Sequence, residues 1–190
     1  MTSALFIGIN AACGTGNFLT EILSRKLRVV ERKYRKSLRD YERNAVHAVS
    51  CIYGIDIQED NVQECCNRLF NVFDAAYTGL FKTKANDKCR NAIRFILKCN
   101  IVQGDALTLM TVGDCPKPII FSQWSPVVGS KFKRHDFAFR TLMQPDDGDK
   151  KSLFAMHEGV VENDLGGKGF IPVSIKDDYR PTNFWELEYV

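Results

Sequence analysis

Short apolar runs alternate with amphipathic stretches through the first two-thirds of the chain. The apolar runs have the length of buried strands and cover residues 5–9, 51–57, 100–103 and 118–121. Between them, apolar residues recur at intervals of three and four, which predicts helices from Asn17 onward, over 34–49, over 60–77 and up to residue 97. Strands that alternate with helices are typical of βαβ units, so the pattern predicts an α/β protein with a parallel sheet.

Beyond residue 126 the pattern weakens. Residues 144–151 and 166–169 have the composition of loops, and residues 170–175 and 185–190 are predicted edge strands. We therefore expect one domain over residues 1–190, with a core over 1–126 and a loop-rich part over 127–190 that completes the sheet.

Composition narrows the class of protein. Of the 190 residues, 45% are hydrophobic and 26% are charged, which excludes a disordered chain. No apolar run reaches the roughly 18 residues of a membrane span, and the first residues lack the basic start of a signal peptide. The seven cysteines include an adjacent pair but no Cys-x-x-Cys, and the three histidines show no ligand spacing. We therefore expect reduced thiols in a cytoplasmic protein without a disulfide framework or a metal.

The positive charge is concentrated in one segment. Residues 24–43 hold nine basic and three acidic side chains, a net +6, whereas the whole chain carries +3. Such a patch suits a polyanion such as DNA, and a solvated helix face is the alternative interpretation. Lys131–Arg134 form a second, smaller basic cluster with the same two interpretations.

The predicted strands deliver chemically useful residues at their ends. The first is followed by a turn containing Gly14 and Gly16, where the absence of a Cβ allows close approach to a ligand. Asp56 ends the second strand and suits two ribose hydroxyls, and Asp105 follows the third. Ser122 and Trp124 follow the fourth. Ligands of open α/β sheets collect at such strand ends.

At this point the chain resembles a known family. Its segment Asn10-Ala-Ala-Cys-Gly-Thr-Gly-Asn-Phe-Leu19 is similar to the first motif, Asp-Pro-Ala-Cys-Gly-Ser/Thr-Gly-x-Phe-Leu, of the S-adenosylmethionine (AdoMet)-dependent adenine-N6 DNA methyltransferases of bacterial restriction-modification systems and mobile elements. Tyr53–Ile57 resembles the second motif and Asn100–Ala106 the third. The resemblance covers residues 4–126.

The resemblance implies a Rossmann-like methyltransferase fold, a mostly parallel sheet with helices on both faces. It implies that AdoMet is held by residues of the three motifs: Asn10, Ala12, Cys13, Gly14, Gly16, Asp56, Ile57, Asp105 and Ala106. The catalytic residues would be Ser122, which accepts a hydrogen bond from the adenine amino group, and Trp124, which stacks on the flipped base. The implied activity is methyl transfer to adenine N6 in DNA. DNA would be contacted through Arg25–Arg43 and Lys131–Arg134, with a possible specificity subunit.

Several departures from the family pattern support a second hypothesis. The first motif begins Asn10-Ala11 instead of Asp-Pro, and the fourth lacks both prolines of the usual Asp/Asn/Ser-Pro-Pro-aromatic segment. The family's upstream segment, which completes the methionine pocket, is expected to be missing. Asp56 follows Gly16 by 40 residues instead of about 20, so a basic helical insertion is expected over 24–49. The alternative function is a non-catalytic module that binds AdoMet or nucleic acid together with a partner subunit.

Overall fold

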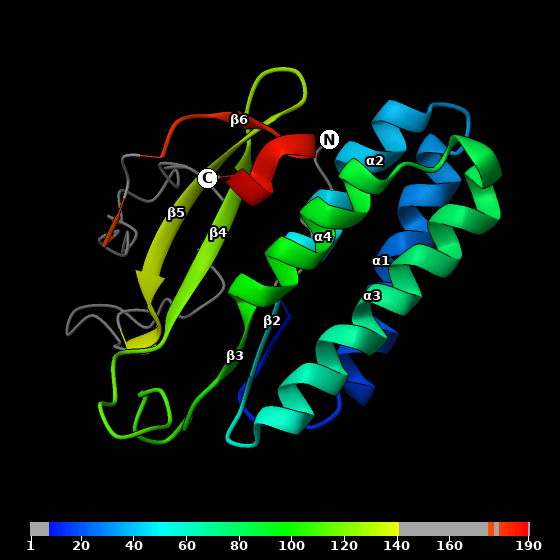
Figure 1. The fold of residues 1–190 in the computed structure, drawn as a ribbon. Coiled ribbons are helices and arrows are strands. Elements are labelled where there is room, and N and C mark those ends of the chain that lie inside the picture. The colour runs from blue at the N-terminus through cyan, green and yellow to red at the C-terminus, as the bar shows by residue number, and fades with distance from the viewer. Residues whose placement is uncertain (1–7, 141–174, 177–178, 190) are drawn as a thin grey trace, which may run out of the picture.

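Two small sheets and a layer of helices make up the part of the chain that the computed structural model describes, residues 8–140, 175–176 and 179–189 (Figure 1). The elements in chain order are β1 (Gly8–Asn10), α1 (Asn17–Tyr34), α2 (Leu38–Ser50), β2 (Ile52–Asp56), α3 (Glu59–Phe81), η1 (Lys82–Lys84), α4 (Asp87–Asn100), β3 (Ile101–Gln103), β4 (Ile120–Pro126), β5 (Lys131–Ala138), β6 (Thr182–Asn183) and η3 (Phe184–Tyr189).

The first three strands form a parallel sheet in the order β1-β2-β3. Gly8 of β1 is opposite Ile52 of β2, and Gly54 of β2 is opposite Ile101 of β3. A parallel pair needs a long crossover connection, which α1 and α2 supply between β1 and β2, and α3 and α4 supply between β2 and β3. The predicted βαβ arrangement is therefore confirmed for these three strands.

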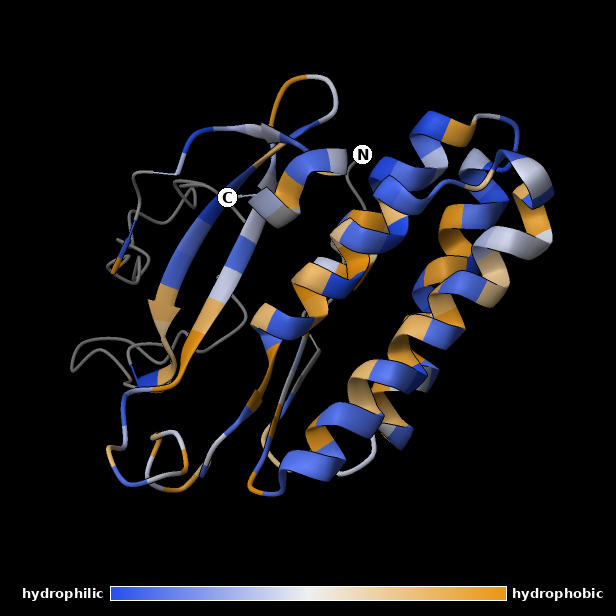
Figure 2. Ribbon diagram, viewed as in Figure 1, coloured by the Kyte–Doolittle hydropathy of each residue, from blue (hydrophilic) through white to orange (hydrophobic). Residues whose placement is uncertain are grey.

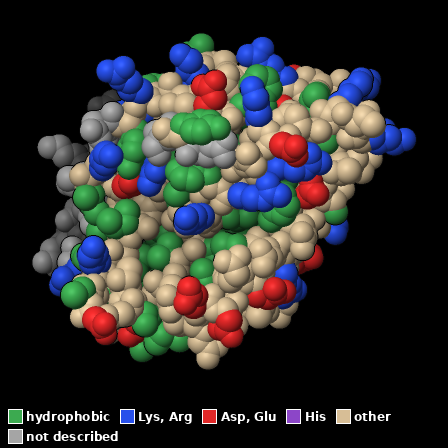
Figure 3. Space-filling model, viewed as in Figure 1, with side chains coloured by type: hydrophobic (Ala, Val, Ile, Leu, Met, Phe, Trp, Pro, Cys, Tyr) green, Lys and Arg blue, Asp and Glu red, His purple; other side chains and the backbone are tan. Residues whose placement is uncertain are grey.

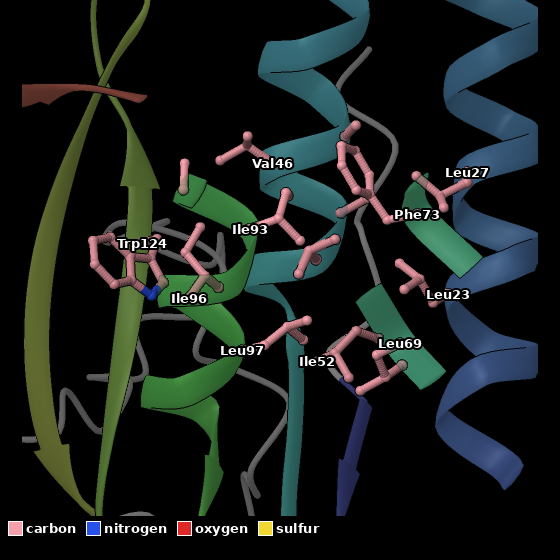
Figure 4. Packing of buried hydrophobic residues seen from close by; sticks show 14 of the residues in the cluster. Leu23, Leu27, Val46, Ile52, Leu69, Phe73, Ile93, Ile96, Leu97 and Trp124 are labelled. Carbon is pink, nitrogen blue, oxygen red and sulfur yellow. The ribbon is translucent and has the colours of Figure 1, made fainter. Parts of the chain in front are cut away.

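The four α-helices pack on one face of this sheet. Their apolar residues at intervals of three and four point inward, as the hydrophobic bands along each helix indicate (Figure 2). Leu23 and Leu27 of α1 contribute to the same buried cluster as Phe73 of α3 and Ile93 of α4 (Figure 4). Ile52 joins this cluster from the sheet. Because successive side chains of a strand point to opposite faces, its neighbour Tyr53 faces away from the helices.

A second sheet covers the opposite face. The strands β4 and β5 pair antiparallel from Ile120↔Ala138 to Pro126↔Phe132, and β6 extends β5. Tyr53 and Ile55 of β2 form a separate buried cluster with Phe121 of β4, Phe137 of β5 and Phe139, which follows β5. The Tyr53 and Phe121 rings meet edge to face with centroids 5.2 Å apart. The parallel sheet is therefore enclosed by helices on one side and by an antiparallel sheet on the other.

The expected Rossmann-like, mostly parallel sheet with helices on both faces is wrong. The fourth strand pairs with β5 in a separate sheet and does not join the parallel one. It also runs opposite to β3, because Ile119 contacts Gly104, just after β3, whereas Ser122 bonds to Asn100, just before β3. The connection over residues 104–119 contains no helix. Its glycine, prolines and β-branched residues disfavour one, and without a crossover helix the chain turns back instead of returning parallel.

Two predictions concern the C-terminal part. The predicted edge strand over 185–190 is wrong, because Phe184–Tyr189 form the 3-10 helix η3, with Phe184 and Leu187 buried against the helices. The predicted strand over 170–175 lies outside the described residues except for Ile175, whose N–H donates to the Asp136 carbonyl.

Glu42, a fully buried carboxylate of α2, connects four segments. Its Oε1 accepts hydrogen bonds from the Tyr77 hydroxyl of α3 and from the Asn86 side chain at 2.7 Å, and its Oε2 accepts one from the Trp185 indole of η3 at 3.0 Å. Asn86 in turn caps α4 by accepting from the Cys89 N–H. Burial, followed by the bond to Glu42, raises the pKa of the Tyr77 hydroxyl. One side chain therefore holds α2, α3, α4 and η3 in place.

We expect Glu42→Ala to destabilise the protein by about 3 kcal/mol, because the buried donor Tyr77 and the part-buried donors Asn86 and Trp185 lose their acceptor at about 1 kcal/mol each. In a chain of this size that corresponds to a fall in Tm of roughly 6–12 °C. Glu42→Gln, which keeps the shape and one acceptor, should cost less. Thermal unfolding followed by circular dichroism measures both, with Glu64→Ala on the exposed side of α3 as the control. Equal Tm values for Glu42→Ala and Glu64→Ala would contradict the role assigned to Glu42.

Candidate functional site

Three turns meet where the parallel strands end. Residues 10–16 follow β1, residues 56–58 follow β2 and residues 104–107 follow β3, and we call these segments the carboxyl edge. They lie side by side because Asn10 is opposite Gly54 and Asp56 is opposite Gln103 in the sheet. The structure thereby brings together all the residues expected to hold a cofactor.

Asp56 connects the three turns. Its Oδ2 accepts a hydrogen bond from the Gly14 N–H at 2.8 Å, and its backbone carbonyl accepts one from the Gly104 N–H at 2.9 Å. Its Oδ1 accepts from the Gln58 N–H at 3.0 Å and from the Asn61 side chain at 3.1 Å. The middle strand therefore positions the turns on both of its sides through one residue.

These bonds keep the Asp56 carboxylate charged. Burial by itself raises the pKa of Asp56, but the hydrogen bonds from Gln58, Asn61 and Gly14 outweigh it, and the pKa falls below its usual value. A carboxylate has about four acceptor positions, and these neighbours occupy three. The side chain is half-buried, and these three bonds leave one acceptor position on Oδ2.

The glycine turn has little space beneath it. Gly16 has a φ of +82°, a left-handed conformation that favours glycine, and a Cβ there would lie 2.6 Å from the Cys65 sulfur of α3. Gly14 also has a positive φ, +50°, but no atom lies within 4 Å of its missing Cβ. Cys13 is buried under the turn, and its N–H donates to the Ile55 carbonyl at 2.9 Å. A hydrogen bond with Cys65 is the main cause of the lowered pKa of the Cys13 thiol.

Arg68 was not among the residues predicted from the sequence. Its Nη1 donates to both the carbonyl oxygen and the hydroxyl of Thr15, at 2.9 and 3.0 Å, so α3 places a cation beside the glycine turn. Arg68 follows Cys65 by three residues, a spacing that places both on the same side of α3, and Cys65 lies beneath Gly16. What the sequence did not reveal is that this side faces the turn after β1.

Apolar side chains lie exposed on the carboxyl edge and beside it. The exposed fractions of Phe18, Ile57 and Leu107 are 62%, 59% and 94%. Asp105 lies two residues before Leu107, and its Oδ1 accepts from the Leu107 N–H at 2.8 Å, the main cause of the lowered pKa of Asp105. The edge thus combines carboxylates with uncovered apolar surface, which suits a ligand that has both polar and flat apolar parts.

Asn10, Ala12 and Ala106 are the other residues predicted to hold the cofactor. The Asn10 side chain accepts a hydrogen bond from the Ala12 N–H at 3.2 Å, so Asn10 shapes the start of the glycine turn. Ala12 is exposed on this turn. Ala106 is half-buried and packs against the cluster beneath the second sheet.

Ser122 and Trp124 lie at the other end of the parallel strands. The Ser122 N–H donates to the Asn100 side chain, which itself donates to the Ser50 carbonyl. Asn100 and Ser50 precede β3 and β2, so Ser122 lies at the amino edge of the sheet. The strand β2 separates this edge from Asp56, since the four steps from Ile52 to Asp56 span about 13 Å at roughly 3.3 Å per residue.

Both side chains are also buried. The Ser122 hydroxyl donates to Asp136 at 2.7 Å, and Asp136 additionally forms a bidentate pair with Arg134 and accepts from the Tyr179 hydroxyl. Burial alone raises the pKa of Asp136, but these bonds outweigh it and lower the pKa. Trp124 is 3% exposed and packs against helix α4, toward Ile96 (Figure 4) and edge to face with Phe95. The structure does not bring the predicted catalytic residues together with the predicted cofactor residues.

Comparison of the chain with protein-family models, with curated proteins and with solved structures finds no match. Among the helices of the described residues, none is long and apolar enough to cross a membrane.

The two glycines of the turn give a matched pair of substitutions. Gly14→Ala should cost about 1 kcal/mol, because only its left-handed backbone is strained. Gly16→Ala should cost about 3 kcal/mol, because the new methyl group also collides with the Cys65 sulfur. Urea unfolding measures both values, and Gly16→Ala combined with Cys65→Ala should cost less than the two single changes added together. Equal costs for the two glycines would contradict the packing described for the turn.

Proposed function

We propose that the chain binds AdoMet at the carboxyl edge and acts in AdoMet-dependent methyl transfer to adenine N6 of DNA. The observation that carries the proposal is the meeting of three motifs, widely separated in the sequence, around Asp56. Each motif resembles a cofactor-binding segment of the adenine-N6 DNA methyltransferases, and Asp56 bonds to the turns of the other two.

The residues of the edge fit the parts of AdoMet. Asp56 keeps one acceptor position for a ribose hydroxyl, and the position that accepts from Asn61 would serve a second hydroxyl. Ile57 and Leu107 would offer apolar surface to the adenine ring. The Asp105 carboxylate, which already accepts from the Leu107 N–H, would accept from the adenine amino group. Above Gly14 the space is open, so a ligand can approach the backbone there.

The positive charge of Arg68, beside the glycine turn, suits the carboxylate of the methionine part of AdoMet. Arg68 is held there by two bonds to Thr15, and a guanidinium attracts a carboxylate. The Asn10 side chain has no charge with which to pair an amino group. When bound, AdoMet supplies an electrophilic methyl group on a sulfonium; the residues of this chain bind and orient it.

Two observations favour the second hypothesis, a module that binds AdoMet but depends on a partner subunit for catalysis. Ser122 and Trp124 are 2% and 3% exposed, so a flipped base has no access to either. They also lie at the opposite end of β2 from Asp56, whereas the methyl group and the adenine nitrogen must come into contact. We therefore favour a partner that supplies the groups that hold the base.

AdoMet binding is testable by titration calorimetry. The unaltered protein should release heat, and Asp56→Asn should weaken the affinity at least tenfold, because the variant loses the charge and one acceptor that the ribose uses. Asp60→Asn, an exposed acid four residues further along, is the matched control and should bind as the unaltered protein does. The absence of heat with the unaltered protein would overturn the proposed function.

Catalysis is tested separately with AdoMet carrying a radiolabelled methyl group and mixed double-stranded DNA. The chain alone should transfer no label, because the geometry leaves the base without its acceptor. Label transfer by the unaltered chain, lost in a folded Ser122→Ala variant, would instead assign catalysis to this chain. Circular dichroism establishes that the variant is folded, since the substitution removes a buried bond to Asp136.

A further inference from the structure

A row of arginines runs from α1 into α2. The arginines follow one another at intervals of three or four residues: Arg25, Arg28, Arg32, Arg35, Arg39 and Arg43. Residues at these intervals lie on the same side of a helix, so the first three form one stripe on α1 and the last two lie together on α2. Ser37 caps α2 between them by accepting from the Asp40 N–H.

The structure joins this row to the second basic segment. Arg39 Nε donates to the Ser130 hydroxyl at 2.8 Å, and Arg43 donates to the Val127 carbonyl at 3.2 Å. Both acceptors belong to the turn between β4 and β5, which places Lys131 next to α2. Two basic segments that are almost 90 residues apart in the sequence thereby form one surface.

We call this surface the basic shoulder. It consists of six exposed cations: Arg32, Lys33, Arg35, Lys36, Arg39 and Lys131. Two exposed acids, Glu31 and Asp40, lie among them, so the shoulder carries a net +4. None of the six forms an ion pair with another residue of the described part of the chain.

The shoulder and the carboxyl edge lie at opposite ends of the molecule. The 18 residues of α1 separate them, about 27 Å at 1.5 Å per residue. Lys and Arg side chains gather along the upper rim in Figure 3, whereas acidic side chains are prominent along the lower edge. At the lower end the exposed acids Glu59 and Asp60 begin α3 directly after the carboxyl edge. Within the described residues, the basic shoulder and these acids therefore lie at opposite ends of α1.

We propose that the basic shoulder binds the phosphate backbone of double-stranded nucleic acid. A guanidinium presents a fork of donors that matches a phosphate, and half of the shoulder's cations are arginines. A duplex carries one charge for about every 1.7 Å of its axis, so a surface spread over two helices meets several phosphates at once. The surface reads no base sequence, because it consists of charge alone.

An anionic lipid surface fits the shoulder less well. Helices that lie on membranes insert an apolar side next to their cations. Here the apolar sides of α1 and α2 are buried in the core, through Leu23, Leu27 and Val46 among others. The large apolar side chain that stands exposed in the adjacent turn, Val128 at 92%, offers little surface for insertion.

Fluorescence anisotropy with a fluorescein-labelled 20-base-pair duplex, without cofactor, tests the proposal. Four phosphate contacts predict that the affinity falls about a hundredfold between 50 and 200 mM salt. Replacing Arg32, Arg35 and Lys36 together by Gln should weaken binding at least tenfold at 100 mM salt. It should also reduce the slope of log affinity against log salt by about 2.7.

The matched control replaces three exposed cations away from α2, namely Lys98, Lys117 and Arg140, by Gln. Lys117 and Arg140 flank the end of the β4–β5 pair opposite to Lys131, so the control removes the same charge from another part of the fold and should change the affinity less than twofold. Equal losses in both triple variants, no binding of the duplex by the unaltered chain, or tighter binding to phosphatidylserine vesicles than to the duplex would each overturn the proposal. Because the shoulder variant should still bind AdoMet as the unaltered chain does, this test is independent of the proposed cofactor site.

Discussion

The arrangement of the helices depends on the fully buried carboxylate of Glu42. Burying Glu42 is costly unless its oxygens accept hydrogen bonds, and its three donors come from α3, from the cap of α4 and from η3. All three must therefore be in place at once, which makes the docking of these segments cooperative. Since α2 leads directly into β2, the same contact fixes the strand that ends at Asp56.

At the other end of β2, the Asp56 carboxylate likewise joins several segments by accepting their hydrogen bonds. Asp56 accepts hydrogen bonds from the turns on both sides of its strand, so the protein's own bonds hold the carboxyl edge together. Preorganised acceptors and backbone groups reduce the cost of ordering a site on binding. The molecule thus presents an ordered, acidic edge at one end of α1 and a basic shoulder at the other.

The position of Ser122 illustrates where local patterns stop being informative. The apolar run 118–121 before it was predicted to be a strand that ends at Ser122, whereas β4 begins at Ile120 and continues through Ser122 to Pro126. The resemblance placed the end of this strand beside Asp56. The direction of a strand depends on the connection that precedes it, and residues 104–119 turn back without a helix. Met110, for example, bridges to both Asp105 and Pro118 within this connection. The missing helical pattern in this segment was visible in the sequence and was the available signal for a reversed strand.

The sequence alone determined the local elements of this protein. Apolar spacing predicted the helices and the first three strands, and strand ends predicted that Gly14, Asp56 and Asp105 share an edge, because helical crossovers make neighbouring strands parallel. Only the tertiary structure decided which face each element covers. Contacts such as Glu42 with Trp185, Arg68 with Thr15, or Arg39 with Ser130 join residues 53 to 143 positions apart, and no local periodicity encodes them. Strand direction and burial depend on such contacts, so they separated Ser122 and Trp124 from the edge and joined two basic segments into one shoulder.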